Sequence, residues 1–168
     1  VLGPMAREDL RVLLEKQVKE SIEKGAKLLA GGMALSDRNT DKSLDKKFDK
    51  GFYYPPTVLE NVKPGMPAFD EELFGPVISL IQAKDEEDAI RLANNTSYGL
   101  GAGIFTQDIQ RGEYLGTHCI EAGACQINGI VSSDPRIPFG GVKTSGLGYE
   151  LGSAGIREFV HIKTVGIS

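Results

Sequence analysis

Two glycine-rich stretches are the first places to look for ligand-binding chemistry. Residues 146–152 read Gly-Leu-Gly-Tyr-Glu-Leu-Gly, which is one residue longer than the dinucleotide fingerprint and does not follow an expected strand. Residues 140–144 are similar to the end of a phosphate-binding loop, but Val142 stands where a glycine should precede Lys143. We therefore expect surface loops whose glycines serve backbone turns.

The cysteines and histidines do not form an obvious reactive group. His118 and Cys119 are neighbours on an expected helix, where adjacent side chains point about 100° apart and do not face each other. Cys125 falls in an expected buried strand, where a small apolar thiol is ordinary. With two histidines in all and no cluster of thiols, the sequence predicts no metal site.

The elements that would position side chains follow from the hydrophobic pattern. Apolar residues at helical spacing predict an amphipathic helix over residues 6–24, ended by Gly25. A short strand is expected over residues 26–30 and an edge strand, interrupted by prolines, over residues 51–60. The highly charged residues 36–50 are expected to form a solvated loop.

The middle of the chain alternates strands with helices. Strands are expected over residues 77–81, 102–105 and 124–128, separated by helices over residues 85–93 and 108–119. This order predicts an α/β fold with a three-layer parallel sheet. Beyond it we expect a long loop, a short helix and a terminal strand without a partner in this chain, the last two over residues 150–156 and 159–167.

Composition excludes several classes of function. The 168 residues are 40% hydrophobic and 25% charged, which is typical of one soluble domain. The sequence starts at Val1 rather than Met, so we expect one domain that is a piece of a longer protein or a complete chain. Its 19 basic and 23 acidic residues are interspersed, so nucleic-acid binding is not expected. No apolar run approaches the roughly 20 residues of a membrane span. Two cysteines fit a reducing compartment better than a disulfide framework, so we expect a cytoplasmic protein.

Three motifs give a more specific indication. They are residues 71–77 (Glu-Glu-Leu-Phe-Gly-Pro-Val), residues 138–148 (Pro-Phe-Gly-Gly-Val-Lys-Thr-Ser-Gly-Leu-Gly) and residues 157–165 of the tail. With them, nearly the whole chain resembles the C-terminal part of the NAD(P)-dependent aldehyde dehydrogenases. The resemblance implies part of a catalytic domain over residues 1–156 and an oligomerisation strand over residues 157–168, and hence a homo-oligomer.

The resemblance also implies roles for single residues. Glu72 would accept hydrogen bonds from the ribose hydroxyls beside the nicotinamide, and Phe74 would pack near the nicotinamide ring, so NAD or NADP is the expected cofactor. Phe139 would line the pocket of a small aldehyde. Residues 128–137 are similar to the same loop of bacterial succinate-semialdehyde dehydrogenases.

In residues 128–137, the donors for the distal carboxylate of such a substrate are Ser132, Ser133 and Arg136.

The family's catalytic cysteine, which attacks the aldehyde to form a thioester, stands in a Gly-Gln-x-Cys context that this chain lacks. The dinucleotide-binding domain is missing as well. We expect either an enzyme fragment that is inactive alone, most similar to succinate-semialdehyde dehydrogenase, or a non-catalytic binding or assembly module of the same fold.

Overall fold

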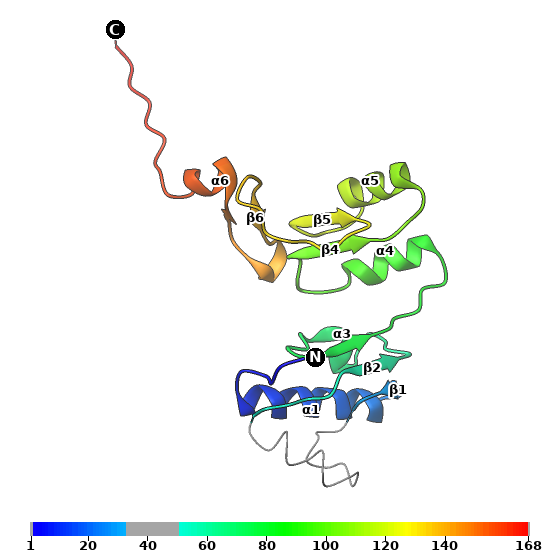
Figure 1. Cartoon of the computed structure of the whole chain (residues 1–168). Helices are drawn as coiled ribbons and strands as arrows, with labels where there is room; N and C mark the ends of the chain where they lie inside the picture. The colour runs from blue at the N-terminus through cyan, green and yellow to red at the C-terminus, as the bar shows by residue number, and fades with distance from the viewer. Residues whose placement is uncertain (1, 33–50, 168) are drawn as a thin grey trace. The chain divides into compact units, whose positions relative to one another are not determined.

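The structure, a computed structural model, describes residues 2–32 and 51–167 (Figure 1). The chain divides into two compact units, Val1–Gln82 and Ala83–Ser168, and each is described by itself. The charged stretch 36–50, expected to be a loop, lies outside the described residues.

The first unit combines one long helix with a three-stranded sheet. Helix α1 (Glu8–Glu23) is followed by β1 (Lys27–Ala30), which pairs antiparallel with β2 (Thr57–Glu60), and β2 pairs in parallel with β3 (Val77–Ser79). The short helix α3 (Pro67–Asp70) lies between β2 and β3 in the sequence. The apolar spacing of α1 and the stop at Gly25, whose φ is 107°, are confirmed.

The expectation of an edge strand over residues 51–60 is wrong, because β2 is the central strand of its sheet. Pro55 and Pro56 precede the strand instead of interrupting it. Every residue of β2 therefore keeps its N–H, and the first one, Thr57, donates to the carbonyl of Pro76 at 2.9 Å.

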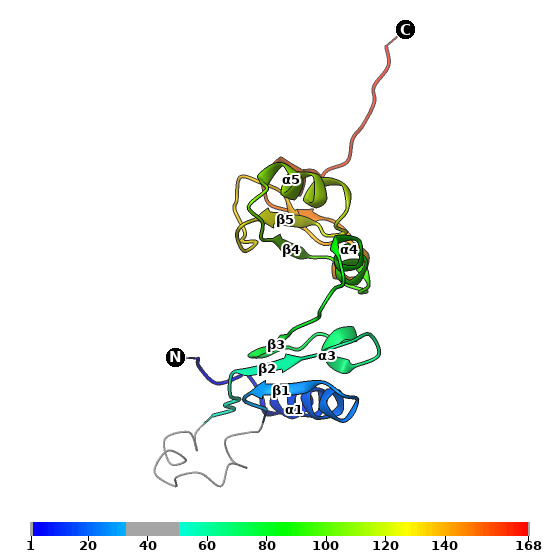
Figure 2. The ribbon, with the colours of Figure 1, turned by 90° about the vertical axis from the view of Figure 1, so that its right-hand side faces the viewer.

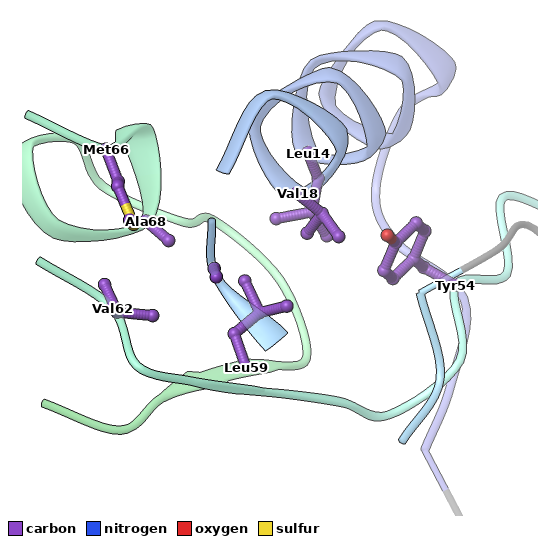
Figure 3. Close-up of a cluster of buried hydrophobic side chains, with 8 residues drawn as sticks. Leu14, Val18, Tyr54, Leu59, Val62, Met66 and Ala68 are labelled. Atoms are coloured by element: carbon purple, nitrogen blue, oxygen red, sulfur yellow. The ribbon is translucent and has the colours of Figure 1, made fainter. Parts of the chain in front are cut away.

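The core of the first unit lies between α1 and apolar side chains of residues 54–68, which include β2 and the start of α3 (Figure 3). Leu14 and Val18 on α1 meet Leu59 on β2 and Val62 in the loop beyond, and none of the four is more than 1% exposed. Burial of this kind contributes about 1.5–3 kcal/mol for each large apolar side chain.

The second unit is built on a parallel strand pair. It contains α4 (Glu86–Asn94), β4 (Gly101–Ile104), α5 (Ile109–His118) and β5 (Ala124–Ile127). β4 and β5 are parallel, and α5 lies over β5 in both views (Figure 1, Figure 2). Helices α4 and α5 each start at an aspartate cap, since Asp85 accepts from the N–H of Asp88 and Asp108 from that of Arg111.

The α/β class is confirmed, but the three strands expected in one parallel sheet are divided between two sheets of the described chain. β3 pairs with β2 and continues this pairing at Leu80, whose N–H donates to the carbonyl of Leu59 at 2.8 Å. β4 pairs with β5. The order of strands and helices predicts that the strands run parallel, but it does not determine which strands pair with each other.

The C-terminal part holds a small hairpin and a short helix. β6 (Phe139–Gly140) pairs antiparallel with β7 (Tyr149–Glu150), the 3-10 turn η2 (Lys143–Ser145) lies between them, and α6 (Gly152–Arg157) follows. Residues 160–167 form neither helix nor strand, and their apolar side chains are largely exposed. The expected terminal strand has no partner in the described chain, and a strand needs one to form a ladder. Among residues 2–32 and 51–167, no helix is long and apolar enough to span a membrane.

Candidate cofactor and substrate sites

The segment that contains Glu72 and Phe74 is fixed at both of its ends. It begins where α3 stops, at the N–H of Glu71, which donates to the carbonyl of Pro67 at 3.0 Å. It ends at β3, which is hydrogen-bonded to the central strand β2. Between these points, the N–H of Gly75 donates to the carbonyl of Leu73 at 2.8 Å, which makes a tight turn just after Phe74. We call residues 71–75 the cofactor segment.

Helix α1 holds the cofactor segment from the inside. The side chain of Gln17 is in a residue only 5% exposed, and its Nε2 donates to Glu71 Oε2 at 2.8 Å and to the carbonyl oxygen of Glu72 at 3.2 Å. One turn earlier, Leu14 lies so close to Gly75 that any side chain at that glycine would collide with it. Sequence reasoning missed Gln17, although a polar residue beside Val18 on the buried face of an amphipathic helix is a usable signal.

Glu72 and Phe74 are both exposed on the first unit. Among the described residues, the carboxylate of Glu72 has no hydrogen bond and no ion pair. The ring of Phe74 is 64% exposed and lines an open, mostly apolar pocket of about 470 Å³ together with residues 2–6, Leu10, Leu73, Gly75 and Pro76. Glu72 does not line this pocket. A free carboxylate and an exposed ring, two residues apart, suit a ligand with hydroxyl groups and a flat apolar ring.

A second pocket brings together three of the four residues expected to bind the substrate. Ser132, Ser133 and Phe139 line a pocket of about 500 Å³ in the second unit. Its other walls are residues 100–103 and Phe105, at and just beyond β4, with residues 129–131 of the following loop. Apolar walls with two hydroxyl groups suit a short ligand that has one polar end.

Arg136 does not line this pocket. Its Nε donates to Asp134 Oδ1 at 2.9 Å and its Nη2 to Asp134 Oδ2 at 2.5 Å, a two-point ion pair. The hydrogen bond from Arg136 holds the pKa of the Asp134 carboxyl below its usual range. The side chain of Arg136 is nevertheless 85% exposed.

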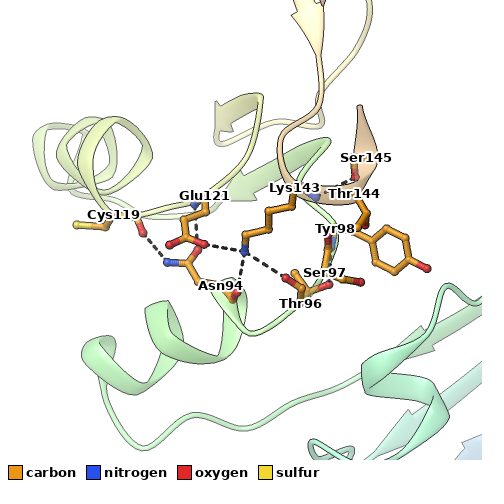
Figure 4. Close-up of polar contacts among 10 residues, drawn as sticks. Asn94, Thr96, Ser97, Tyr98, Cys119, Glu121, Lys143, Thr144 and Ser145 are labelled. Carbon is orange, nitrogen blue, oxygen red and sulfur yellow. Dashed lines mark hydrogen bonds and ion pairs between the residues drawn. The ribbon is translucent and has the colours of Figure 1, made fainter. Parts of the chain in front are cut away.

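Lys143 connects the segment after Phe139 to the end of α4 and to the loop after α5 (Figure 4). Its ammonium donates to the carbonyls of Asn94 and Thr96 at 2.8 and 3.2 Å and pairs with Glu121 Oε2 at 2.7 Å. On the neighbouring residues, Thr144 Oγ1 donates to the carbonyl of Ser97, and Ser145 Oγ accepts from the N–H of Gly99. The ammonium of Lys143 is thus bound by oxygens of the protein itself, which supports a structural role for residues 140–144 instead of phosphate binding.

Neither cysteine is arranged as a nucleophile for the second pocket. Cys119 and Cys125 are free thiols, and neither lines that pocket. Burial raises the pKa of the Cys125 thiol, which disfavours the reactive thiolate. The ring of His118 contacts that of Tyr114, with 5.1 Å between their centroids. In the two described ranges, no group of three or more His, Cys, Asp or Glu side chains could hold a metal ion.

Comparison with known proteins identifies what this arrangement is similar to. The family model described as "Aldehyde dehydrogenase family" matches residues 1–165. The succinate semialdehyde dehydrogenase [NAD(P)+] of Escherichia coli K12 is 48% identical over 98% of this chain and 33% of its own length. A probable succinate-semialdehyde dehydrogenase [NADP(+)] of Synechocystis is 44% identical over 99% of this chain and 34% of its own length.

Solved structures agree with this result. The crystal structure of a Mycobacterium tuberculosis aldehyde dehydrogenase complexed with NAD+ matches with a TM-score of 0.81 and 37% identity. The match covers 94% of this chain and 30% of that protein. The chain therefore spans about a third of the length of the relatives that it matches.

Proposed function

The chain belongs to the aldehyde dehydrogenase family, and from this premise we propose that it supplies two parts of an NAD- or NADP-dependent aldehyde oxidation. One part is the cofactor segment, and the other is the pocket lined by Ser132, Ser133 and Phe139. The observation that carries the proposal is that pocket, which gathers three residues that sequence motifs had marked for substrate binding. The product would be the carboxylic acid.

The described residues fit a nicotinamide cofactor. Glu72 has a carboxylate without a partner in the described ranges, so both of its oxygens can accept hydrogen bonds from ribose hydroxyls. Phe74 offers an exposed ring that would limit the positions of the nicotinamide. The bound cofactor would supply hydride acceptance, and Glu72 and Phe74 would hold its ribose and limit the positions of its nicotinamide ring.

The substrate we propose is succinate semialdehyde, which the names of the E. coli and Synechocystis relatives state. Its carboxylate needs donors, and Ser132 and Ser133 supply two hydroxyl groups at the pocket. Arg136 would add charge, provided that its ion pair with Asp134 is shared or opened. Phe139 would confine the apolar middle of the substrate.

The remaining sequence-based expectations belong to the same proposal. The nucleophile that forms the thioester would come from outside this chain, since Cys119 and Cys125 do not line the pocket, and the chain alone would be inactive. Strands outside this chain would complete the three-layer parallel sheet over the catalytic part, residues 1–156. Residues 157–168 would pair with a second copy in a homo-oligomer, and the cytoplasmic location stays a prediction.

The direct test is a chimera in which this chain replaces the matching third of the E. coli relative. We expect the chimera to reduce NAD or NADP with succinate semialdehyde, as followed by absorbance, and the 168-residue chain alone to produce no reduced cofactor. A folded chimera without activity would contradict the proposal and would favour a binding or assembly module of the same fold.

A further inference from the structure

We infer that Gln17 is a positioning residue for the cofactor, acting through the backbone of Glu72, and this inference rests on the proposed function. Gln17 lies on α1, 54 residues before Glu71 in the sequence, and it does not line the pocket beside Phe74. Its role would be to set the direction in which the Glu72 carboxylate points.

A buried amide at this position needs a reason. Leu14 and Val18, its neighbours on the helix, belong to the apolar core, and a polar side chain that is 95% buried destabilises the fold unless it is hydrogen-bonded. Gln17 meets this need in one place, because both donors of its Nε2 go to adjacent residues of the cofactor segment. An apolar side chain would fill the core equally well but would hold neither residue.

The two hydrogen bonds of Gln17 make the adjacent carboxylates of Glu71 and Glu72 different, because only that of Glu71 is bound by this side chain. Glu71 is extended, with φ −116° and ψ 158°, and successive side chains of an extended backbone point in opposite directions. Gln17 binds the carboxylate of Glu71, whereas the carboxylate of Glu72 makes no hydrogen bond or ion pair among the described residues. The bond to the Glu72 carbonyl, at 3.2 Å, fixes the peptide from which this carboxylate extends.

The far end of the segment is fixed by packing. Leu14 lies one turn before Gln17 on α1 and fits against Gly75 without space for a side chain. The segment is thus held by α1 on both sides of Phe74. Loss of Gln17 would free Glu72 while the apolar contact at Gly75 persists.

The test is a double-mutant cycle in the chimera, with Gln17→Leu, Glu72→Ala and both changes together. Each single change is expected to raise the KM for the cofactor about fivefold with little change in the KM for the aldehyde. The double variant is expected to be no worse than Glu72→Ala, because both changes remove the same contact. Ser79→Ala is the control, since it removes a bond to the carbonyl of Ala68 and should lower stability without changing the cofactor KM.

The possible outcomes separate the two proposals. If Glu72→Ala raises the cofactor KM and Gln17→Leu does not, the inference about Gln17 is wrong while the proposed function stands. If the two effects multiply, Gln17 acts independently of Glu72 and the inference is also wrong. If Glu72→Ala has no effect, the proposed role of Glu72 fails and the inference fails with it.

A second measurement on the 168-residue chain does not depend on activity. Gln17→Met, which keeps the length of the side chain, is expected to increase amide hydrogen exchange in residues 71–75 and to leave exchange in β2 unchanged. Unchanged exchange in residues 71–75, or an equal increase throughout the unit, would contradict the inference.

Discussion

At the scale of single residues, the second pocket has a polar part and an apolar part. Ser132 and Ser133 offer hydroxyl groups, whereas Phe139 and the β4 side offer apolar surface. If the proposed substrate binds here, the site would distinguish substrates by whether its hydroxyl groups find a partner, because a hydrogen bond to a charged group contributes more than a single apolar contact.

Replacement of Ser132 and Ser133 by alanine should therefore affect charged substrates selectively. In the chimera, we expect each change to raise the KM for succinate semialdehyde about tenfold or more, since a hydrogen bond to a charged group contributes roughly 1.5–3 kcal/mol. The KM for an uncharged aldehyde of similar length should change less than twofold. Equal effects on both aldehydes would show that these hydroxyl groups do not contact the substrate carboxylate. The measurement is steady-state kinetics with the two aldehydes in parallel.

At the scale of elements, the loop that carries Phe139 depends on one cation. Three oxygens, from the end of α4, the loop after it and the loop after α5, surround the ammonium of Lys143, whose side chain is 24% exposed. Substitution Lys143→Met should destabilise the second unit by about 2 kcal/mol, because it leaves those oxygens without a charged donor. Urea unfolding measures this loss. Lys19→Met is the matched control, since that side chain is 76% exposed, and it should change stability little. Equal stability of the two variants would contradict the role of Lys143.

The start of α4 predicts how stability depends on pH. A hydrogen bond from Arg91, and then one from the N–H of Lys84, lower the pKa of the Asp88 carboxyl below its usual 3.8. Because the folded pKa is the lower one, the stabilisation is present above the usual value and is lost as pH falls through the folded value. Thermal unfolding of Asp88→Asn should vary less with pH in the acidic range than that of the parent chain. Identical slopes for the two chains would exclude this contribution.

Local elements could be predicted from the sequence, but their long-range partners could not. The bounds of α1, α4 and α5 follow from apolar spacing, from the stop at Gly25 and from the capping aspartates, all of which are local signals. The central place of β2 and the separation of β3 from β4 depend on contacts between residues distant in the sequence. For the same reason, the motifs identified Phe74 and Phe139, but they identified neither Gln17, which holds the cofactor segment from α1, nor the distant partners of Lys143.

At the scale of the whole molecule, the described chain exposes an unusual amount of apolar surface. Phe105, Ile130, Phe159 and Ile162 are between 72% and 97% exposed. Large exposed apolar groups mark contact surfaces, and the relatives are three times as long as this chain. These surfaces are therefore expected to be covered in a complete enzyme by the rest of the polypeptide or by another copy.

The tail gives the test of assembly. Deletion of residues 159–168 removes Phe159, Ile162 and Ile167, which are 89–98% exposed and have no strand partner in the described chain. We expect the chimera to form oligomers and its truncated version to shift toward monomers, as measured by light scattering coupled to gel filtration. Replacement of His161 and Lys163 by threonine, which keeps the apolar positions, should leave the assembly intact. Unchanged oligomers after truncation would assign assembly to another surface.

The assignment of Phe74 and of the Ser132–Ser133 pocket to two different compact units has a consequence for protein engineering. Each unit has its own core or hydrogen-bond network, so loop residues 129–133 can be exchanged without repacking α1 against the cofactor segment. A library confined to that loop should yield enzymes with new aldehyde preferences and an inherited choice of nicotinamide.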